Sequence, residues 1–366
     1  MGVDRGIAMG IDRRKFLKGA AVTAAASTVF SPHSFAQTGN VRWKCATSWP
    51  KSLDVLFGGA QMIADRVSAM TDGKFTIRAY EAGELVPGLQ VLDAVQQGTV
   101  ECGHSAGYYY VGKNPTLGFA TGVPFGLTAS EQNAWLYSAG GLELIREVYD
   151  DFGIINFPAG NTTAQMGGWF KKEVKTAADF KGLKMRIPGI GGQVMAKLGV
   201  NVQVLPGGEI YLALDRGAID AAEWVGPHDD EKLGLQKAAK FYYYPGWWEP
   251  GATFDMMVGK KAYAALPKAY KEILASACAE ANLAVAADYD AKNQAALQRL
   301  KKGGTQLRRY SNDILKAGSK AAQELHAENS AKNAGYKKVY TPWDSFRRSI
   351  HSWHQVNEKP LMDFTG

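Results

Sequence analysis

One arrangement of residues occurs twice in this chain and restricts the fold more than any other feature. Residues 89–110, LQVLDAVQQGTVECGHSAGYYY, and residues 209–230, EIYLALDRGAIDAAEWVGPHDD, each read as a short helix stopped by a glycine, then a strand, then a cluster of polar and aromatic residues. The glycines are Gly98 and Gly217. The repetition favours an α/β protein with two similar lobes, although coincidence within an α/β chain explains it equally well.

The chain after residue 40 opens with the same kind of alternation. Residues 41–50 and 74–84 have the pattern of strands, and residues 53–70 between them carry apolar side chains at helical spacing. A strand, a helix and a second strand in this order predict a parallel sheet. The 366 residues exceed what one core usually supports, so two domains are expected.

The polar clusters of the two units predict where a ligand binds. In open α/β sheets, ligands bind beyond the carboxyl ends of the strands. The residues expected at those ends are His104, Tyr108, Tyr109 and Tyr110 in the first unit, and Glu223, Trp224 and His228 in the second.

The N-terminus has the features of an export signal. Arg13, Arg14 and Lys15 precede an apolar run, and the small-residue site Ser34-Phe35-Ala36 follows it. The paired arginines before Phe16-Leu17 resemble the twin-arginine type, and an ordinary secretory signal is the alternative. We expect cleavage near Ala36 and a soluble periplasmic product.

Composition excludes several classes of protein. The formal net charge of +7 is modest, and no basic block interleaved with aromatic residues indicates nucleic-acid binding. Three cysteines allow at most one internal disulfide and make a thiol-ligated metal improbable. The sequence contains no GxSxG, HExxH or Walker motif, so no catalytic residue is assigned and an organic cofactor is not expected.

The stretch KMRIPG, residues 184–189, places an arginine at the end of a short strand. The planar guanidinium of Arg186 can hold a carboxylate through two parallel hydrogen bonds. It can equally lie on a solvated sheet edge. The strand pattern alone leaves both interpretations open.

Three oxygen-bearing side chains stand in aromatic or glycine-rich surroundings. Glu223 precedes Trp224, Glu249 follows Trp247-Trp248, and Gln165 precedes Gly167-Gly168. If these groups are buried together, a hard cation such as sodium or calcium would stabilise them, because such ions take oxygen ligands. The alternative is that the two glutamates lie far apart in solvent.

The residues assembled so far resemble those of the extracytoplasmic solute-binding proteins of TRAP transporters, the DctP-type family. The resemblance covers nearly the whole chain after the leader and is most specific in the block KGLKMRIPGIGGQVMAKLGVNVQVLPGGEIYLALDRGAIDAAEW. GNTTAQMGGWFKKE, EWVGPHDD and WWEPGATF are most similar to the subgroup that binds 2-oxo monocarboxylates such as pyruvate or 2-oxobutyrate. The family implies an α/β, periplasmic-binding-protein-like fold: two lobes joined by crossing strands and a long helix, with a ligand cleft between them.

The resemblance also implies the roles of individual residues. Arg186 would bind the substrate carboxylate, and the cation would bridge the carboxylate and keto oxygens of the substrate. The implied cation ligands are Gln165, Glu223, the Trp224 backbone carbonyl and Glu249. The implied substrate-binding residues are Arg186, Gln165, Asn161, Trp224 and Tyr109, together with Tyr108 or Tyr110.

Charge supports this reading of the ligand. A monocarboxylate would be repelled by two glutamates unless a cation reversed the local charge, whereas a dicarboxylate binder needs no such cation. The expected function is therefore capture of a 2-oxo acid and delivery to the membrane permease, without chemistry. The alternatives are another hydroxy- or dicarboxylate ligand, a metal-dependent enzyme acting on keto acids, and a sensor for a membrane kinase.

The resemblance gives approximate domain boundaries. Residues 1–36 form the leader, and residues 331–366 a C-terminal helical tail. Lobe I comprises residues 37–160 plus about 251–285, and lobe II residues 161–250 plus about 286–330. The C-terminal helices could also pair two chains into a homodimer, as in some keto-acid-binding relatives.

Overall fold

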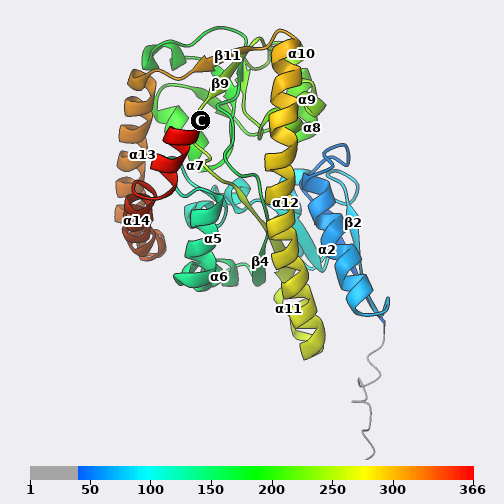
Figure 1. Cartoon of the computed structure of the whole chain (residues 1–366). Coiled ribbons are helices and arrows are strands. Elements are labelled where there is room, and N and C mark those ends of the chain that lie inside the picture. Colours follow the sequence, from blue (N-terminus) through cyan, green and yellow to red (C-terminus); the bar gives the residue numbers. More distant parts are fainter. Residues whose placement is uncertain (1–39) are drawn as a thin grey trace, which may run out of the picture. The chain divides into compact units, whose positions relative to one another are not determined.

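The strands assemble into two separate sheets that lie at opposite ends of the long helix α12 (Lys268–Lys302) (Figure 1). The computed structural model describes residues 40–366, and the expected leader lies outside the described residues. The lobe boundaries stay a prediction, but each lobe is expected to contain one sheet.

The first sheet has the order β2-β1-β3-β10-β4. The first three of these strands run parallel, and β10 is antiparallel to both of its neighbours, β3 and β4. The predicted strand–helix–strand opening is therefore confirmed. The strands are β1 (Val41–Thr47), β2 (Phe75–Tyr80), β3 (Cys102–Ser105), β4 (Ile154–Asn161) and β10 (Thr253–Gly259).

The second sheet has the order β11-β9-β5-β8-β6-β7. Strands β8, β6 and β7 run parallel, and β5 is antiparallel to β8 and β9. The strand that ends at Arg186 is internal to this sheet. The strands are β5 (Trp169–Phe170), β6 (Lys184–Arg186), β7 (Asn201–Gln203), β8 (Ala221–Ala222), β9 (Phe241–Tyr244) and β11 (Gln306–Arg309).

Besides the long helix α12, two segments of the chain cross between the sheets, and they lie side by side. One leads from β4 to β5 and the other returns from β9 to β10. They are joined by backbone hydrogen bonds: Thr162 N–H donates to the Ala252 carbonyl (3.0 Å), and Gln165 N–H to the Glu249 carbonyl (3.2 Å). Gly246 permits this approach, since a Cβ there would lie 2.4 Å from the Gln165 carbonyl oxygen.

Helices surround both sheets. α12 contacts β4 and α2 at one end and α9 at the other, so it spans both sheets, while α13 and α14 pack against each other (Figure 1). The helices, with four 3₁₀ turns, are α2 (Leu56–Met70), η1 (Gly88–Gln90), α3 (Val91–Gln96), η2 (Gly107–Tyr110), η3 (Pro115–Leu117), α4 (Gly118–Thr121), α5 (Ala129–Ser138), α6 (Gly141–Asp150), η4 (Ala177–Phe180), α7 (Gly189–Lys197), α8 (Gly207–Asp215), α9 (Pro227–Leu233), α10 (Leu235–Ala238), α11 (Lys260–Ala264), α12, α13 (Asn312–Lys332), α14 (Ala334–His354) and α15 (Glu358–Thr365).

The repeated unit of the sequence is present in both sheets. α3 and α8 each end before a glycine with positive φ, 73° at Gly98 and 78° at Gly217, a conformation that favours glycine. β3 follows the first helix and β8 the second. Each strand leads directly into the cluster of polar and aromatic residues that the sequence indicated.

One secondary-structure prediction was wrong. In the sequence, the alanine-rich stretch from Tyr270 to about Ala334 has a helical pattern and predicts helix throughout. In the structure, Gly304 (φ 93°) follows the end of α12, and β11 then pairs with β9 in parallel. β11 is a short edge strand with the sequence QLRR, so it has only one apolar residue and no alternation to reveal it. α13 resumes after it.

Two further features follow from the described residues. Cys45, Cys102 and Cys278 are buried and free, so the packing of the cores rather than a disulfide stabilises this part of the chain. Among residues 40–366, no helix has both the length and the apolar character that a membrane span requires.

Candidate functional site

Arg186 and Glu223 meet because two neighbouring parallel strands end together. β6 pairs with β8 so that Arg186 lies opposite Ala222, and Glu223 follows immediately. The Glu223 N–H donates to the Arg186 carbonyl (3.2 Å). The carboxyl ends of these strands therefore carry both residues, as expected for a ligand site of an α/β sheet.

The guanidinium of Arg186 is buried, with 1% of the residue exposed. Its Nε donates to the Leu205 carbonyl (3.1 Å), and its Nη1 donates to the Glu223 carbonyl (2.9 Å) and to Glu223 Oε1. The Trp224 ring lies 5.0 Å from the guanidinium carbon. The alternative of an arginine on a solvated sheet edge is therefore wrong.

Glu249 and Gln165 reach the same group from the two crossing segments. Both are buried, and the backbone bond between these residues holds the segments together. The Gln165 amide donates to Thr162 Oγ1 (3.2 Å), which leaves its carbonyl oxygen free for another partner. The alternative that the glutamates lie far apart in solvent is also wrong, because each is buried and the charge of Glu223 acts on Glu249.

The group contains several buried polar atoms without a hydrogen-bond partner among the described residues. They are Arg186 Nη2, Glu223 Oε2, Glu249 Oε2 and Gln165 Oε1. A buried unpaired polar atom costs about 1–3 kcal/mol, and more where it is charged. Their convergence from four segments of the chain indicates a place built for a ligand.

The electrostatics of the group favour an added positive charge. Burial raises the pKa of Glu223 to about 8, although the charge of Arg186 acts to lower it. Burial, and then the charge of Glu223, raise the pKa of Glu249 well above its usual value. Burial acts to lower the pKa of Arg186, but the carboxylate of Glu223 and other nearby groups raise it. The single positive charge of Arg186 thus interacts with two carboxyl groups, Glu223 and Glu249, and cannot neutralise both.

The three tyrosines of η2 divide between two environments. Burial, followed by the charge of Glu249, raises the pKa of Tyr108, and burial raises the pKa of Tyr109 to about 12 although the charge of Arg186 lowers it. Both therefore face the charged group. Tyr110 Oη instead accepts from the Leu92 N–H (3.2 Å) and lies 2.9 Å from Ser105 Oγ, within the first lobe's core.

The other predicted residues have their own partners. The Asn161 amide donates to Thr253 Oγ1 (2.9 Å) and accepts from the Thr163 N–H (2.8 Å). His104 accepts from Trp49 Nε1 (2.7 Å), which leaves its Nε2 proton for the Ala159 carbonyl at 3.0 Å. His228 Nε2 lies 2.8 Å from Asp54 Oδ1. A ligand contact by Asn161 remains a prediction.

Sequence reasoning missed three contributors. The Leu205 carbonyl binds Arg186, and a backbone group leaves no signal in a sequence. Trp49 packs edge-on against Trp224, with ring centroids 6.5 Å apart. In the sequence, only its position shortly after a predicted strand indicated a role. The negative charge of Asp230 acts to raise the pKa of the Glu223 carboxyl group.

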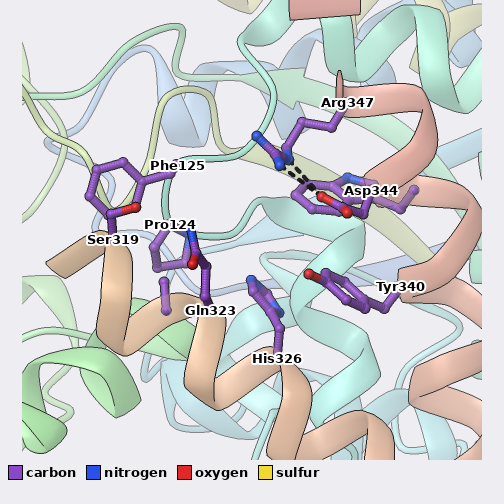
Figure 2. A pocket seen from close by; sticks show the side chains of 10 residues that line it. Pro124, Phe125, Ser319, Gln323, His326, Tyr340, Asp344 and Arg347 are labelled. Atoms are coloured by element: carbon purple, nitrogen blue, oxygen red, sulfur yellow. Dashed lines mark hydrogen bonds and ion pairs between the residues drawn. The ribbon is translucent and has the colours of Figure 1, made fainter. Parts of the chain in front are cut away.

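Two pockets need to be distinguished from this group. One, of about 450 Å³, is bordered by Tyr108 and Tyr109, so it adjoins the charged group. The other lies between α13, α14 and the loop at Phe125 (Figure 2). Neither pocket is lined by Arg186, Glu223, Glu249 or Gln165, but only the first is lined by Tyr108, Tyr109 and Ile187, the residue that follows Arg186. Its volume of about 70 Å³ is small, and its Asp344 is already bound by Arg347.

The donor set of the charged group fits a hard cation. Residues 40–366 contain no cluster of three His, Cys, Asp or Glu side chains that could hold a metal ion. Two carboxylates and an amide oxygen do converge here, and backbone and ligand oxygens can complete an all-oxygen shell. Sodium or calcium, rather than a metal that prefers nitrogen or sulfur, suits such a set.

Comparison with known proteins agrees with the fold. Residues 45–333 match the bacterial extracellular solute-binding proteins, family 7 (DctP), and the chain belongs to this family. It is 60% identical over 360 residues to the monocarboxylate 2-oxoacid-binding periplasmic protein of Nostoc sp. (strain PCC 7120), covering 97% of this chain and 99% of that protein.

Solved structures of TRAP solute-binding proteins share the fold. The protein from Bordetella bronchiseptica, with copurified calcium and picolinate, is 48% identical and has a TM-score of 0.89 over 90% of this chain and 98% of its own. The protein from Colwellia psychrerythraea, with calcium and pyruvate, is 40% identical (TM-score 0.86; 88% and 99% covered). The protein from Pseudoalteromonas atlantica, with sodium and pyruvate, is 39% identical (TM-score 0.86; 88% and 99% covered).

Proposed function

We propose that this protein is the periplasmic substrate-binding subunit of a TRAP transporter and that it captures a small 2-oxo monocarboxylate together with a cation. The observation that carries the proposal is the group of buried, unpaired atoms on Arg186, Glu223, Glu249 and Gln165. Relatives with 39% to 60% identity that bind 2-oxo acids, or pyruvate with calcium or sodium, support it.

Each residue of the group has a role in this proposal. Arg186 binds the substrate carboxylate, since its Nη2 has no protein acceptor, whereas Nε and Nη1 are fixed by the Leu205 and Glu223 carbonyls and by the Glu223 carboxylate. Glu223, Glu249, the Gln165 side chain and the Trp224 carbonyl hold the cation. When bound, the cation neutralises the two carboxylates and attracts the carboxylate and keto oxygens of the substrate. Tyr108 and Tyr109 cover the ligand from the first lobe.

The crossing segments explain how binding is communicated. Gln165 and Glu249 belong to the two segments that cross side by side between the sheets, whereas Arg186 and Glu223 lie at the ends of strands of the second sheet. A cation held by Gln165, Glu249 and Glu223 would therefore tie the connection to the second lobe. We infer that ligand and cation together favour lobe closure, which presents the occupied protein to the membrane permease.

Thermal unfolding tests this function. Protein freed of ligand and metal is heated with pyruvate, 2-oxobutyrate, lactate or succinate, each with and without calcium or sodium. Ligand at about a thousand times its dissociation constant should add about 4 kcal/mol of stability. We expect stabilisation by 2-oxo acids that depends on the cation. Stabilisation by succinate alone, or by no acid, would contradict the proposal.

Every role proposed above is a binding role, and no residue is proposed to catalyse a reaction. A separate incubation tests for an enzyme, because consumption of pyruvate or 2-oxobutyrate by the purified protein would show catalysis. We expect the acid to be recovered unchanged. We further propose export through the twin-arginine leader with cleavage near Ala36; the N-terminal residue of protein purified from the periplasm tests the cleavage site.

The last two helices suggest how two chains pair. Apolar side chains of this region are exposed, among them Trp353, Leu361, Met362 and Phe364, the last with 89% of its surface accessible. The Bordetella bronchiseptica relative is a dimer. We propose that a second copy of the chain covers this apolar surface.

Sedimentation measures this association. Phe364→Asp should shift the protein toward the monomer, because it places a charge in the covered surface. Leu283→Asp is the control: Leu283 is also exposed, at 74%, but it lies on α12. A wild-type protein that sediments as a monomer at all concentrations would contradict the dimer and leave the ligand site unaffected.

A further inference from the structure

The peptide unit between Trp224 and Val225 is held from one side by a buried carboxylate. The Val225 N–H donates to Asp230 Oδ1 (3.2 Å). In a trans peptide the N–H and the carbonyl point in opposite directions. The carbonyl of this unit belongs to Trp224, so it points away from Asp230.

The carbonyls on either side of Trp224 already have partners. The Glu223 carbonyl accepts from Arg186 Nη1 (2.9 Å), and the Val225 carbonyl accepts from the Met166 N–H (3.0 Å). The backbone at residues 223–225 is therefore fixed at both ends. What remains adjustable in this stretch is the direction of the Trp224 carbonyl, which the bond to Asp230 sets.

Asp230 is itself held firmly. It is 1% exposed, and its Oδ2 accepts from Trp169 Nε1 (2.9 Å) and Tyr242 Oη (2.7 Å). The two aromatic rings stack with centroids 4.0 Å apart and planes 15° apart. They belong to β5 and β9, where they lie opposite each other. The Asp230 carboxylate is thus held by side chains of two internal strands of the second sheet.

We propose that Asp230 is a positioning residue of the cation site: through the Val225 N–H, its carboxylate orients the Trp224 carbonyl toward the cation and polarises it. A hydrogen bond from an amide N–H to a carboxylate increases the negative charge of the same amide's oxygen. Some residues do not touch the metal but form a hydrogen bond that orients one of its ligands. Replacing such a residue typically weakens metal affinity about 10–100-fold. The inference rests on the proposed function, since it assumes a cation at Glu223 and Trp224.

Terbium(III) is a suitable probe, because it replaces calcium at oxygen-ligand sites and its luminescence lifetimes in H₂O and D₂O count the bound waters. We expect Asp230→Asn to bind terbium about 10–100-fold more weakly and to hold about one more water, because the Trp224 carbonyl no longer faces the ion. A merely structural role of Asp230 would not change the number of waters on the bound ion.

Two variants separate the Val225 contact from the rest of the Asp230 environment. Trp169→Phe removes one donor to Oδ2 and leaves the Val225 bond, so the water count should stay that of the wild type. In Trp169→Phe/Asp230→Asn, the new amide can turn its oxygen to the Val225 N–H and its NH₂ to Tyr242 Oη. This double variant should recover the wild-type water count.

Further variants keep the test decisive. Asp255→Asn neutralises another buried carboxylate and should leave terbium binding unchanged. If Asp230→Asn does not fold, Asp230→Glu keeps the charge but displaces the carboxylate, and it should also gain a water. Wild-type affinity and water count in the folded Asp230 variants would overturn the inference alone. Failure of the wild-type protein to bind terbium or calcium would overturn the cation site, and the inference with it.

Discussion

Glu223 and Asp255 are both buried carboxyl groups with raised pKa values, but they differ in how their oxygens are used. Asp255, in the first sheet, accepts from Asn156 Nδ2 (2.8 Å) and from Tyr149 Oη (2.8 Å), so each oxygen has a donor. Glu223, at the end of a strand in the second sheet, leaves Oε2 unpaired and shares Arg186 with Glu249. Burial raises the pKa to about 7 for Asp255 and to about 8 for Glu223.

The difference shows how a structural carboxylate is told from one that binds a ligand. Burial and a raised pKa are common to both, so neither identifies a site on its own. The protein supplies all the donors that Asp255 needs, whereas the Glu223 group becomes complete only when a cation and an anion are added. Replacing residues of the two groups should therefore affect binding in one case and stability in the other.

The largest expected effect is that of Arg186→Ala on ligand binding. Loss of the guanidinium removes the anchor of the substrate carboxylate and leaves Glu223 without its buried partner. We expect pyruvate affinity to fall by about 3–5 kcal/mol, measured by titration calorimetry with calcium present.

Arg308→Ala is the matched control, since Arg308 pairs with Glu173 outside the charged group. It should bind pyruvate as the wild type does. Arg186→Lys keeps the charge but not the planar fork, and an intermediate affinity is expected. Micromolar binding of any carboxylate by the alanine variant would show that Arg186 does not hold the substrate.

Glu223→Gln sharpens the comparison with Asp255. It removes one negative charge from the cation site, so calcium and pyruvate should weaken together, each by about 1.5–3 kcal/mol. Asp255→Asn should change neither. Calorimetric titration of calcium at several fixed pyruvate concentrations measures both affinities and their coupling. If calcium dependence of pyruvate binding is the same in Glu223→Gln as in the wild type, Glu223 is not a cation ligand.

Asp255 should instead govern how stability varies with pH. Its pKa is raised from 3.8 to about 7 in the folded protein, so the folded state binds this proton more tightly than the unfolded state does. The resulting stabilisation is complete below about pH 4 and is lost as pH rises through about 7. Denaturant unfolding between pH 4 and 8 should show a smaller decline for Asp255→Asn, by up to about 4 kcal/mol. Identical slopes in both proteins would refute this.

The contrast between these groups also explains what could be predicted from sequence. Glu223 follows the strand of the second repeated unit, and Arg186 ends another short strand. Because the carboxyl ends of parallel strands meet at one edge of a sheet, a position at such an edge was predictable for each residue. The strand pattern alone did not show that the two residues meet. Glu249 and Gln165 lie on irregular segments between the sheets, where no period fixes their direction. The family resemblance, rather than a pattern of spacing, placed them in the same site.

Features that depend on backbone atoms or on long-range pairing could not be predicted. β11 is an edge strand defined by its bonds to β9, and the Leu205 carbonyl is a partner that any residue type could supply. Asp230 stands in a run of acidic residues that reads equally well as a solvated helix start. Only the fold shows that Trp169 and Tyr242 bind it.

The smallest expected effects separate two adjacent tyrosines of η2. Tyr109 faces Arg186, whereas Tyr110 is bound to Ser105 and the Leu92 N–H. Tyr109→Phe should weaken pyruvate binding by about 1 kcal/mol and leave stability almost unchanged, because one hydrogen bond near the ligand is lost. Tyr110→Phe should lower the free energy of unfolding by about 1–2 kcal/mol and leave affinity unchanged, because it leaves a buried N–H unpaired. Calorimetry and denaturant unfolding of both variants measure the two quantities. If instead Tyr110→Phe weakened pyruvate binding and Tyr109→Phe lowered the free energy of unfolding, Tyr110 would be the tyrosine that faces the ligand in solution. Tyr109 would then belong to the structural core.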